Sequence, residues 1–282
     1  MRIIENKSFD EERTLYGATD VKIKNCVFSG PADGESALKE SRKIEVESCR
    51  FELRYPLWHV TDGKITDCAL EGDCRASMWY DRDLSVADSN IDGVKAVREC
   101  DDITIENCDI TSTEFGWFCR GVKISESRLQ SEYPFLRSKD IVCEKLSMRA
   151  KYSFQYTENV TVDNCVFDTK DAFWHAKNVT VRNSEIKGEY IGWYSENLRF
   201  ENCVISGTQP FCYAKGLVLE NCELTGADLA FEKSSVTAEL CGSLISVKNP
   251  LSGRIIADGI GEVILDCETG CEIIARFQPA IQ

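Results

Sequence analysis

A repeat with a period of 19 residues runs through most of the sequence and limits the folds that the chain can adopt. Stretches such as VTVDNCVF from Val160, LRFENCVI from Leu198 and LVLENCEL from Leu217 share one pattern, in which apolar and polar residues alternate and an Asn precedes a small residue. The small-residue column is Cys26, Cys49, Cys68, Ser89, Cys108, Ser127, Leu146, Cys165, Ser184, Cys203, Cys222 and Cys241. From Ser89 onward every step is 19 residues. A fixed period kept this long is typical of a repeat architecture.

Each repeat predicts short strands joined by sharp bends. Alternation with a period of two predicts strands that bury one face. The Asn of each unit, such as Asn164, tolerates the left-handed backbone conformation and suits a bend, as does the Asn or Asp five residues earlier, such as Asn159. Residues 172–176 are predicted as a third short strand. Three short strands and three bends in 19 residues describe one rung of a parallel β-helix.

We therefore predict an all-β protein, a single-stranded right-handed parallel β-helix of about a dozen 19-residue rungs that forms one domain over residues 1–282. Residues 1–14 are expected to form an N-terminal cap, 15–241 the regular rungs, and 242–282 the C-terminal rungs and cap. Sides of unequal length favour the right-handed form over a left-handed β-helix, and an extended return favours a β-helix over a leucine-rich repeat. Residues 29–36 predict a protruding loop.

The charge and the cysteines exclude some partners. The net charge of −14 repels phosphate backbones, so we expect no nucleic-acid partner. No apolar run is long enough to cross a bilayer, so no membrane partner is expected either. The chain has 15 Cys and no readable signal peptide, which favours reduced thiols and a cytoplasmic location.

The cysteine column has two interpretations. Cys203, Cys222 and Cys241 fall on consecutive rungs, which raises the question of a metal site. Zinc sites, however, usually contain tight pairs such as C-x2-C, and no such pair occurs here. An inward Cys behaves as a small hydrophobic residue and alternates here with Ser. We therefore expect packing, with no metal and no cofactor.

Two neighbouring columns carry most of the candidate functional residues. The position nine residues before the small-residue column contains Glu40, His59, Tyr80, Glu99, Phe118, Arg137, Tyr156, His175, Tyr194, Tyr213 and Glu232. The position one residue earlier contains Trp58, Trp79, Arg98, Trp117, Trp174 and Trp193. We name these the ring column and the tryptophan column. Strand alternation predicts that one column faces inward and the other outward, and the sequence leaves open which.

Two functions fit these columns. Aromatic residues can stack merely as packing, or they can form a groove in which rings stack on sugars and polar groups hold hydroxyls. The predicted residues that bind an oligo- or polysaccharide are His59, Tyr80, Glu99, Trp117, Trp174, Trp193, Tyr194 and Tyr213. As a catalytic hypothesis, Arg137 holds a substrate carboxylate and Tyr156 or His175 acts as general base in β-elimination or epimerisation of a uronic acid. The alternative is a non-catalytic scaffold that binds a protein or self-associates, and whether the chain is an enzyme stays open.

Three segments carry a resemblance to a known family, namely residues 188–197 (GEYIGWYSEN), 207–213 (GTQPFCY) and 246–253 (SVKNPLSG). They resemble an uncharacterised bacterial family with a domain-of-unknown-function label, and the similarity covers nearly the whole chain. The corner-Asn rungs are similar to the wider pectate-lyase-like superfamily of right-handed β-helices. The resemblance implies the fold and brings no catalytic residues. It also implies that a groove would run along the sheet that contains residues 172–176.

Overall fold

The computed structural model describes residues 1–30 and 35–277, which fall into two compact units, Met1–Ser147 (unit 1) and Met148–Gln282 (unit 2). Each unit is a parallel β-solenoid, and the described residues form no helix and therefore no helix that could span a membrane. The turns are about 19 residues apart and number about 14, against the dozen expected. The predicted all-β solenoid is confirmed, whereas the single-domain organisation stays a prediction. The loop expected at 29–36 falls largely on residues 31–34, outside the described part.

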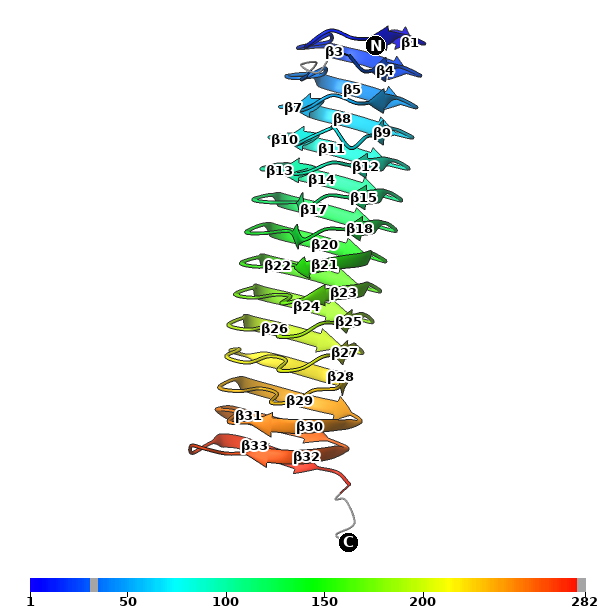
Figure 1. Ribbon diagram of the computed structural model, residues 1–282. Helices are drawn as coiled ribbons and strands as arrows, with labels where there is room; N and C mark the ends of the chain where they lie inside the picture. The colour runs from blue at the N-terminus through cyan, green and yellow to red at the C-terminus, as the bar shows by residue number, and fades with distance from the viewer. Residues whose placement is uncertain (31–34, 278–282) are drawn as a thin grey trace. The chain divides into compact units, whose positions relative to one another are not determined.

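Unit 1 has three sides in each turn (Figure 1). The first side is formed by β1 (Arg2–Glu5), β3 (Thr19–Lys24), β5 (Arg42–Glu47), β8 (Thr61–Thr66), β11 (Arg82–Ala87), β14 (Asp101–Glu106), β17 (Arg120–Ser125) and β20 (Lys139–Glu144). The second side is formed by β2 (Ser8–Phe9), β4 (Val27–Phe28), β6 (Arg50–Phe51), β9 (Ala69–Leu70), β12 (Asn90–Asp92), β15 (Asp109–Thr111) and β18 (Arg128–Gln130). The third side is formed by β7 (Leu57–Trp58), β10 (Met78–Trp79), β13 (Val97–Arg98), β16 (Glu114–Phe115) and β19 (Tyr133–Pro134).

Unit 2 keeps the first two sides. The first side is formed by β22 (Glu158–Asp163), β24 (Lys177–Arg182), β26 (Glu196–Glu201), β28 (Leu217–Thr225), β29 (Ser235–Cys241), β31 (Ser252–Ala257) and β33 (Gly270–Ala275). The others are β23 (Val166–Lys170), β25 (Glu185–Lys187), β27 (Val204–Ser206), β30 (Ser243–Lys248) and β32 (Gly259–Ile264), and β21 (Ser147–Tyr152) begins at the last residue of unit 1. Residues 171–175, 190–194 and 209–213 of the third side form turns. The strand expected at 172–176 is therefore wrong, because Phe173 and His175 have left-handed backbone conformations.

The repeat pattern explains how the turns stack. Successive strands pair in parallel and in register, as Val21 does with Ile44 and Ile23 with Val46. These apolar residues are buried and the polar residues between them face outward. The predicted bends are confirmed, since Asn164 has a φ of 52° and Asn159 a φ of 59°. Each turn therefore buries its inner face against the turns on either side.

Phenylalanines and cysteines fill the interior in lines. Phe28 stacks on Phe51 with ring centroids 4.7 Å apart, and burial of such a side chain contributes about 1.5 to 3 kcal/mol. All 15 thiols are free and twelve are buried. The Cys26 backbone N–H donates to the Cys49 Sγ at 3.3 Å. Cys therefore packs inside as predicted, and where Ser replaces it the hydroxyl accepts the same bond.

Cys241 is an exception to the predicted inward column, because its side chain is exposed. The register between β28 and β29 shifts after Glu220, so that Cys222 pairs with Leu240. Leu240 thus occupies the inward position, and Cys241 points outward.

Candidate functional site

The ring column lies on a third set of bends, and its side chains face outward. Its members from Glu40 to Tyr213 have φ between 52° and 62°, and in the last of these turns Lys233, rather than the expected Glu232, has this conformation. The Tyr80 N–H donates to the Arg98 carbonyl at 3.2 Å, and the Glu99 N–H donates to the Trp117 carbonyl at 2.8 Å. These bonds hold consecutive members one turn apart.

The expectation that one of the two columns faces inward is wrong. Met78 and Asp81 are buried, whereas Trp79 is half-buried and Tyr80 is exposed between them. The left-handed conformation of Tyr80 bends the chain, so strand alternation stops at this position. The tryptophan column therefore lies half-buried against the outer surface, next to the ring column.

In unit 1 the stack of outward rings is interrupted. His59 stacks on Tyr80 with centroids 5.0 Å apart, and Trp58 stacks on Trp79 at 5.6 Å. The Tyr80 ring also stacks on Trp79 at 5.3 Å, and the next member of the ring column is Glu99, so the ring column supplies no further ring to stack on Tyr80.

Glu99 is held firmly by its neighbours. Its Oε1 accepts bonds from Trp79 Nε1 at 3.4 Å and from Arg98 Nε at 3.2 Å. A hydrogen bond to Glu99 raises the pKa of the Tyr80 hydroxyl. Arg98 also donates to Glu114 at 3.4 Å. The carboxylate is therefore oriented and ionically balanced before any ligand arrives.

A depression of about 500 Å³ opens at this interruption, lined by Tyr80, Glu99 and Phe118. We name it the ring slot. Tyr80 and Phe118 are 37% and 44% exposed, so ring surface is available on both sides of Glu99. Arg98 lies over the Trp117 and Phe118 rings, 5.4 and 5.5 Å from their centroids. Trp117 therefore supports Arg98 and does not line the slot.

Unit 2 has an uninterrupted stack. Tyr156, His175, Tyr194 and Tyr213 follow one another with centroids 4.8, 5.1 and 4.7 Å apart and ring planes within 9° of parallel. His175 and Tyr194 thus have both faces covered by neighbouring rings.

The two tryptophans of unit 2 are equally fixed. Trp174 and Trp193 stack at 5.5 Å and donate to the carbonyls of Tyr190 and Gln209 at 2.7 and 2.8 Å. Their polar atoms are already engaged within the solenoid. The predicted binding residues of unit 2 therefore lie together, but no ring face between them is open.

The predicted catalytic residues are divided between the units. Arg137 is an exposed ring-column residue of unit 1, whereas Tyr156 and His175 belong to the stack of unit 2. His175 presents its ring edge to solvent, because its faces are covered. The prediction of binding residues missed Phe118, which lines the slot, and Arg98, which holds Glu99 in place. The sequence contained a signal for Arg98, because it is the one charged residue in the tryptophan column.

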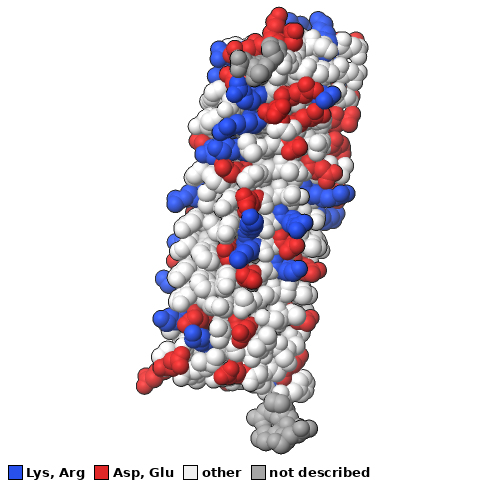
Figure 2. Space-filling model, viewed as in Figure 1, with Lys and Arg blue, Asp and Glu red and all other residues white. Residues whose placement is uncertain are grey.

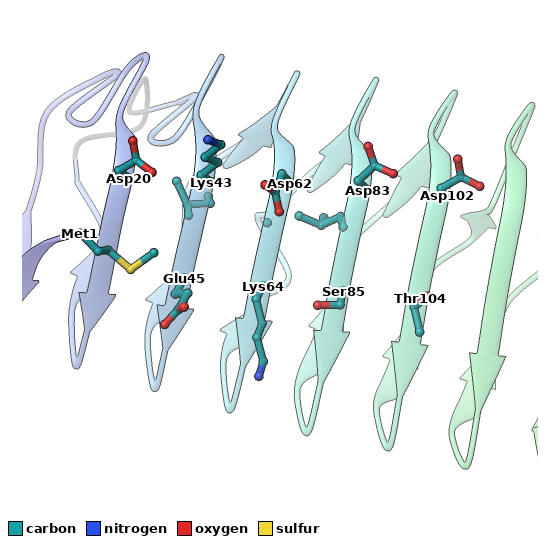
Figure 3. A pocket seen from close by; sticks show the side chains of 13 residues that line it. Met1, Asp20, Lys43, Glu45, Asp62, Lys64, Asp83, Ser85, Asp102 and Thr104 are labelled. Atoms are coloured by element: carbon teal, nitrogen blue, oxygen red, sulfur yellow. The ribbon is translucent and has the colours of Figure 1, made fainter.

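A second depression, of about 560 Å³, lies on the first side of unit 1. Figure 3 shows a row of corner side chains that line it, from successive strands: Asp20, Lys43, Asp62, Asp83 and Asp102. In unit 2 the same corner holds Asn residues, and Asn178 and Asn197 donate to the preceding Asn at 3.2 and 3.1 Å. Among residues 1–30 and 35–277, no three His, Cys, Asp or Glu side chains come together in a way that could hold a metal ion.

Basic and acidic side chains are mixed on the visible surface. The face in Figure 2 carries both basic and acidic side chains, in several small groups. Ion pairs join adjacent turns, as Arg50 and Glu71 do at 2.9 Å and Arg182 and Glu201 do at 2.6 Å.

Comparison with known families and curated proteins gave one match. The family described as "Protein of unknown function (DUF3737)" matches residues 2–274. No curated protein matches the chain.

Solved structures with similar chain paths share little sequence. The A-module of the mannuronan C-5 epimerase AlgE6 from Azotobacter vinelandii is 9% identical with a TM-score of 0.39, over 92% of this chain and 90% of that one. PfbA, a surface adhesin of Streptococcus pneumoniae, is 14% identical with a TM-score of 0.29, over 87% of this chain and 62% of that one. The periplasmic alginate epimerase AlgG is 10% identical with a TM-score of 0.23, over 97% of this chain and 74% of that one.

Proposed function

The chain belongs to this family of unknown function, and we propose that it binds carbohydrate in the ring slot of unit 1. The observation that carries the proposal is the depression of about 500 Å³ at which Glu99 interrupts the outward rings. Tyr80 and Phe118 offer exposed ring surface on its two sides, and Glu99 lies between them.

Sugars match this combination of groups. A sugar ring presents C–H groups on its faces and hydroxyls at its edges, so it can pack on an aromatic ring while its hydroxyls bond to a fixed polar group. Glu99 is such a group, because Trp79 and Arg98 hold it in place. A shallow site of this kind binds one or a few units of a longer chain and leaves the rest in solvent.

The experiment is a glycan array followed by calorimetric titration of the best neutral ligand. Phe118→Ala should weaken binding about tenfold or more, because it removes one wall of the slot. Tyr194→Ala is the matched control, since it removes an equally exposed ring whose faces are covered in unit 2. The proposal is wrong if the array stays blank or if both variants lose the same affinity. A blank array together with a dimer in light scattering would favour the scaffold alternative.

Catalysis on a uronic-acid unit by Arg137, Tyr156 and His175 is a separate hypothesis that does not use the ring slot. His175 can act only through its ring edge, because Tyr156 and Tyr194 cover its faces at 4.8 and 5.1 Å. An imidazole nitrogen at the edge can still remove a proton from a bound sugar. An assay for unsaturated or epimerised products of uronate oligomers tests this: His175→Ala should abolish turnover, and Asp83→Asn, at the first corner, should leave it unchanged. Turnover that survives in His175→Ala would falsify the catalytic hypothesis.

A further inference from the structure

We infer that the ring slot selects a neutral, hydroxyl-rich six-membered ring, and that Glu99 determines this specificity. This inference rests on the proposed carbohydrate function and names its ligand class. Three properties of the slot support it: its width, its charge balance and the direction of its hydrogen bonds.

The width of the slot leaves room for one ring-sized ligand. Tyr80 and Phe118 are two turns apart, as the bond from Tyr80 to Arg98 and the bridge from Arg98 to Trp117 establish. At the usual strand spacing their backbones are therefore about 9.6 Å apart. Glu99 lies between them and Arg98 lies over the Phe118 ring at 5.5 Å, so a ligand contacts the exposed parts of these rings from the solvent side. A saturated six-membered ring with hydroxyls at its edge can pack on an aromatic ring and still reach the Glu99 carboxylate.

The charges around the slot are already balanced. Glu99 is paired with Arg98 at 3.2 Å, and Glu114 is paired with Arg98 at 3.4 Å and with Lys95 at 3.9 Å. The charges of these two carboxylates and two cations sum to zero. A uronate would bring a further anion beside Glu99. The Arg98 guanidinium, which could pair with that anion, already pairs with Glu99 and Glu114. An amino sugar would bring a cation beside Arg98. A neutral ligand meets neither repulsion.

The Glu99 carboxylate favours a ligand that donates hydrogen bonds. An ionised carboxylate accepts hydrogen bonds and cannot donate them, and its two oxygens offer about four acceptor positions. The bonds from Trp79 and Arg98 both go to Oε1 of Glu99, and the Tyr80 hydroxyl also bonds to this carboxylate, so three positions are in use. About one acceptor position thus remains for a hydroxyl group of a ligand, and a carbohydrate hydroxyl is a donor of this kind. Sulfate or phosphate esters, which carry mainly acceptors, would be rejected.

The experiment compares neutral gluco-, manno- and galacto-oligosaccharides with the matching uronic-acid and amino-sugar oligomers, for the full chain and for Glu99→Gln. The unmodified chain should bind a neutral oligomer at least about tenfold more tightly than its charged counterparts. Glu99→Gln leaves Arg98 without its nearest anion, so it should weaken neutral binding and strengthen uronate binding, each by about tenfold. Thermal unfolding of the variant should match that of the unmodified chain, which separates lost contact from lost fold.

The outcomes separate the inference from the proposed function. Tighter binding of a uronate or amino-sugar oligomer by the unmodified chain overturns the inference and leaves carbohydrate binding intact. Unchanged specificity in Glu99→Gln likewise overturns the role assigned to Glu99. If none of the oligomers binds, the proposed function itself fails, and the inference fails with it.

Discussion

The ring column is a continuous stack in unit 2 and an interrupted one in unit 1. In unit 2 four consecutive rings from Tyr156 to Tyr213 stack at 4.7 to 5.1 Å, so that each ring covers a face of its neighbour. In unit 1 Glu99 separates Tyr80 from Phe118, and the space between them is open. A 19-residue period places side chains in line, but one interrupting residue decides whether the rings form a continuous stack or leave a depression between them.

Two other columns differ between the units at single turns. On the inner side next to the ring column, one turn of unit 1 has the buried Asp81, whereas the corresponding position in one turn of unit 2 is Ser195. At the first corner, unit 1 has Asp83 and its acidic neighbours where unit 2 has hydrogen-bonded Asn residues. At these turns unit 1 has ionisable side chains where unit 2 has neutral ones.

The largest expected effect comes from closing the slot. Glu99→Tyr should give unit 1 the uninterrupted stack of unit 2, because Tyr would lie between Tyr80 and Phe118. We expect the affinity for the best neutral oligosaccharide to fall by about a hundredfold or more in calorimetric titration. Tyr194→Glu makes the reverse change in unit 2 and serves as the control, with unchanged affinity at the original slot. Retained affinity in Glu99→Tyr would contradict the comparison.

The next largest effect concerns Asp81. Burial raises the pKa of this carboxyl well above its usual 3.8, because only Oδ1 has a partner, the Val60 N–H at 2.8 Å. Its folded pKa lies above its unfolded one, so the stability it contributes is present below about pH 3.8 and is lost as the pH rises through the folded pKa.

Asp81→Ser should therefore raise the free energy of unfolding by about 1 to 3 kcal/mol at neutral pH. The gain should shrink as the pH falls and be smallest below about pH 3.8, where Asp81 is protonated in both states. Urea denaturation at several pH values measures this. Ser195→Asp in unit 2 should lower the free energy of unfolding at neutral pH, and this loss should shrink on acidification. A gain in Asp81→Ser that grows on acidification would disprove the explanation.

A smaller effect should follow from opening the stack of unit 2. His175→Ala removes the ring between Tyr156 and Tyr194, and the loss of two stacked contacts should cost about 1 to 2 kcal/mol. Because no carboxylate is introduced, no second sugar site should form. Thermal unfolding and titration with a neutral oligosaccharide check both points. A new binding event in this variant would show that a gap between rings is sufficient without Glu99.

The smallest effect is expected at the first corner. Asp83→Asn supplies an amide donor between Asp62 and Asp102, as Asn178 does in unit 2, and should add about 0.5 kcal/mol to the free energy of unfolding. The difference should be larger at low ionic strength, because salt screens repulsion between exposed carboxylates. Asn178→Asp is the matched control and should lose a similar amount. A gain that does not depend on salt would argue against charge repulsion.

The sequence was sufficient for the solenoid because each turn carries its own signal. Asn164 and its equivalents identify the bends, and the alternating apolar residues identify the inner face. The third side was harder to predict, because Phe173 and Tyr194 adopt left-handed conformations that bulky side chains rarely adopt. The packing of adjacent turns imposes these conformations, and no local pattern encodes them.

The candidate site could be predicted only in part. The period placed Tyr80, Glu99 and Phe118 in one column, as the structure has them, but it left open which column faces outward. The sequence could not predict that Arg98 bonds to Glu99 and Glu114, because this depends on the rotamers that these side chains adopt in the folded stack. The period also predicted the wrong side-chain direction for Cys241. The register shift between β28 and β29 that turns Cys241 outward arises from how the two strands pair, and the period does not encode it.

The buried thiols give the protein a set of built-in reporters. Cys26, Cys108 and Cys203 lie at most 3% exposed in different turns, and a thiol reagent reaches them only when a turn opens. In a stack where each turn contacts only its neighbours, opening is expected to begin at an end and to progress inward. The order in which the cysteines become alkylated would therefore trace, turn by turn, how each unit comes apart.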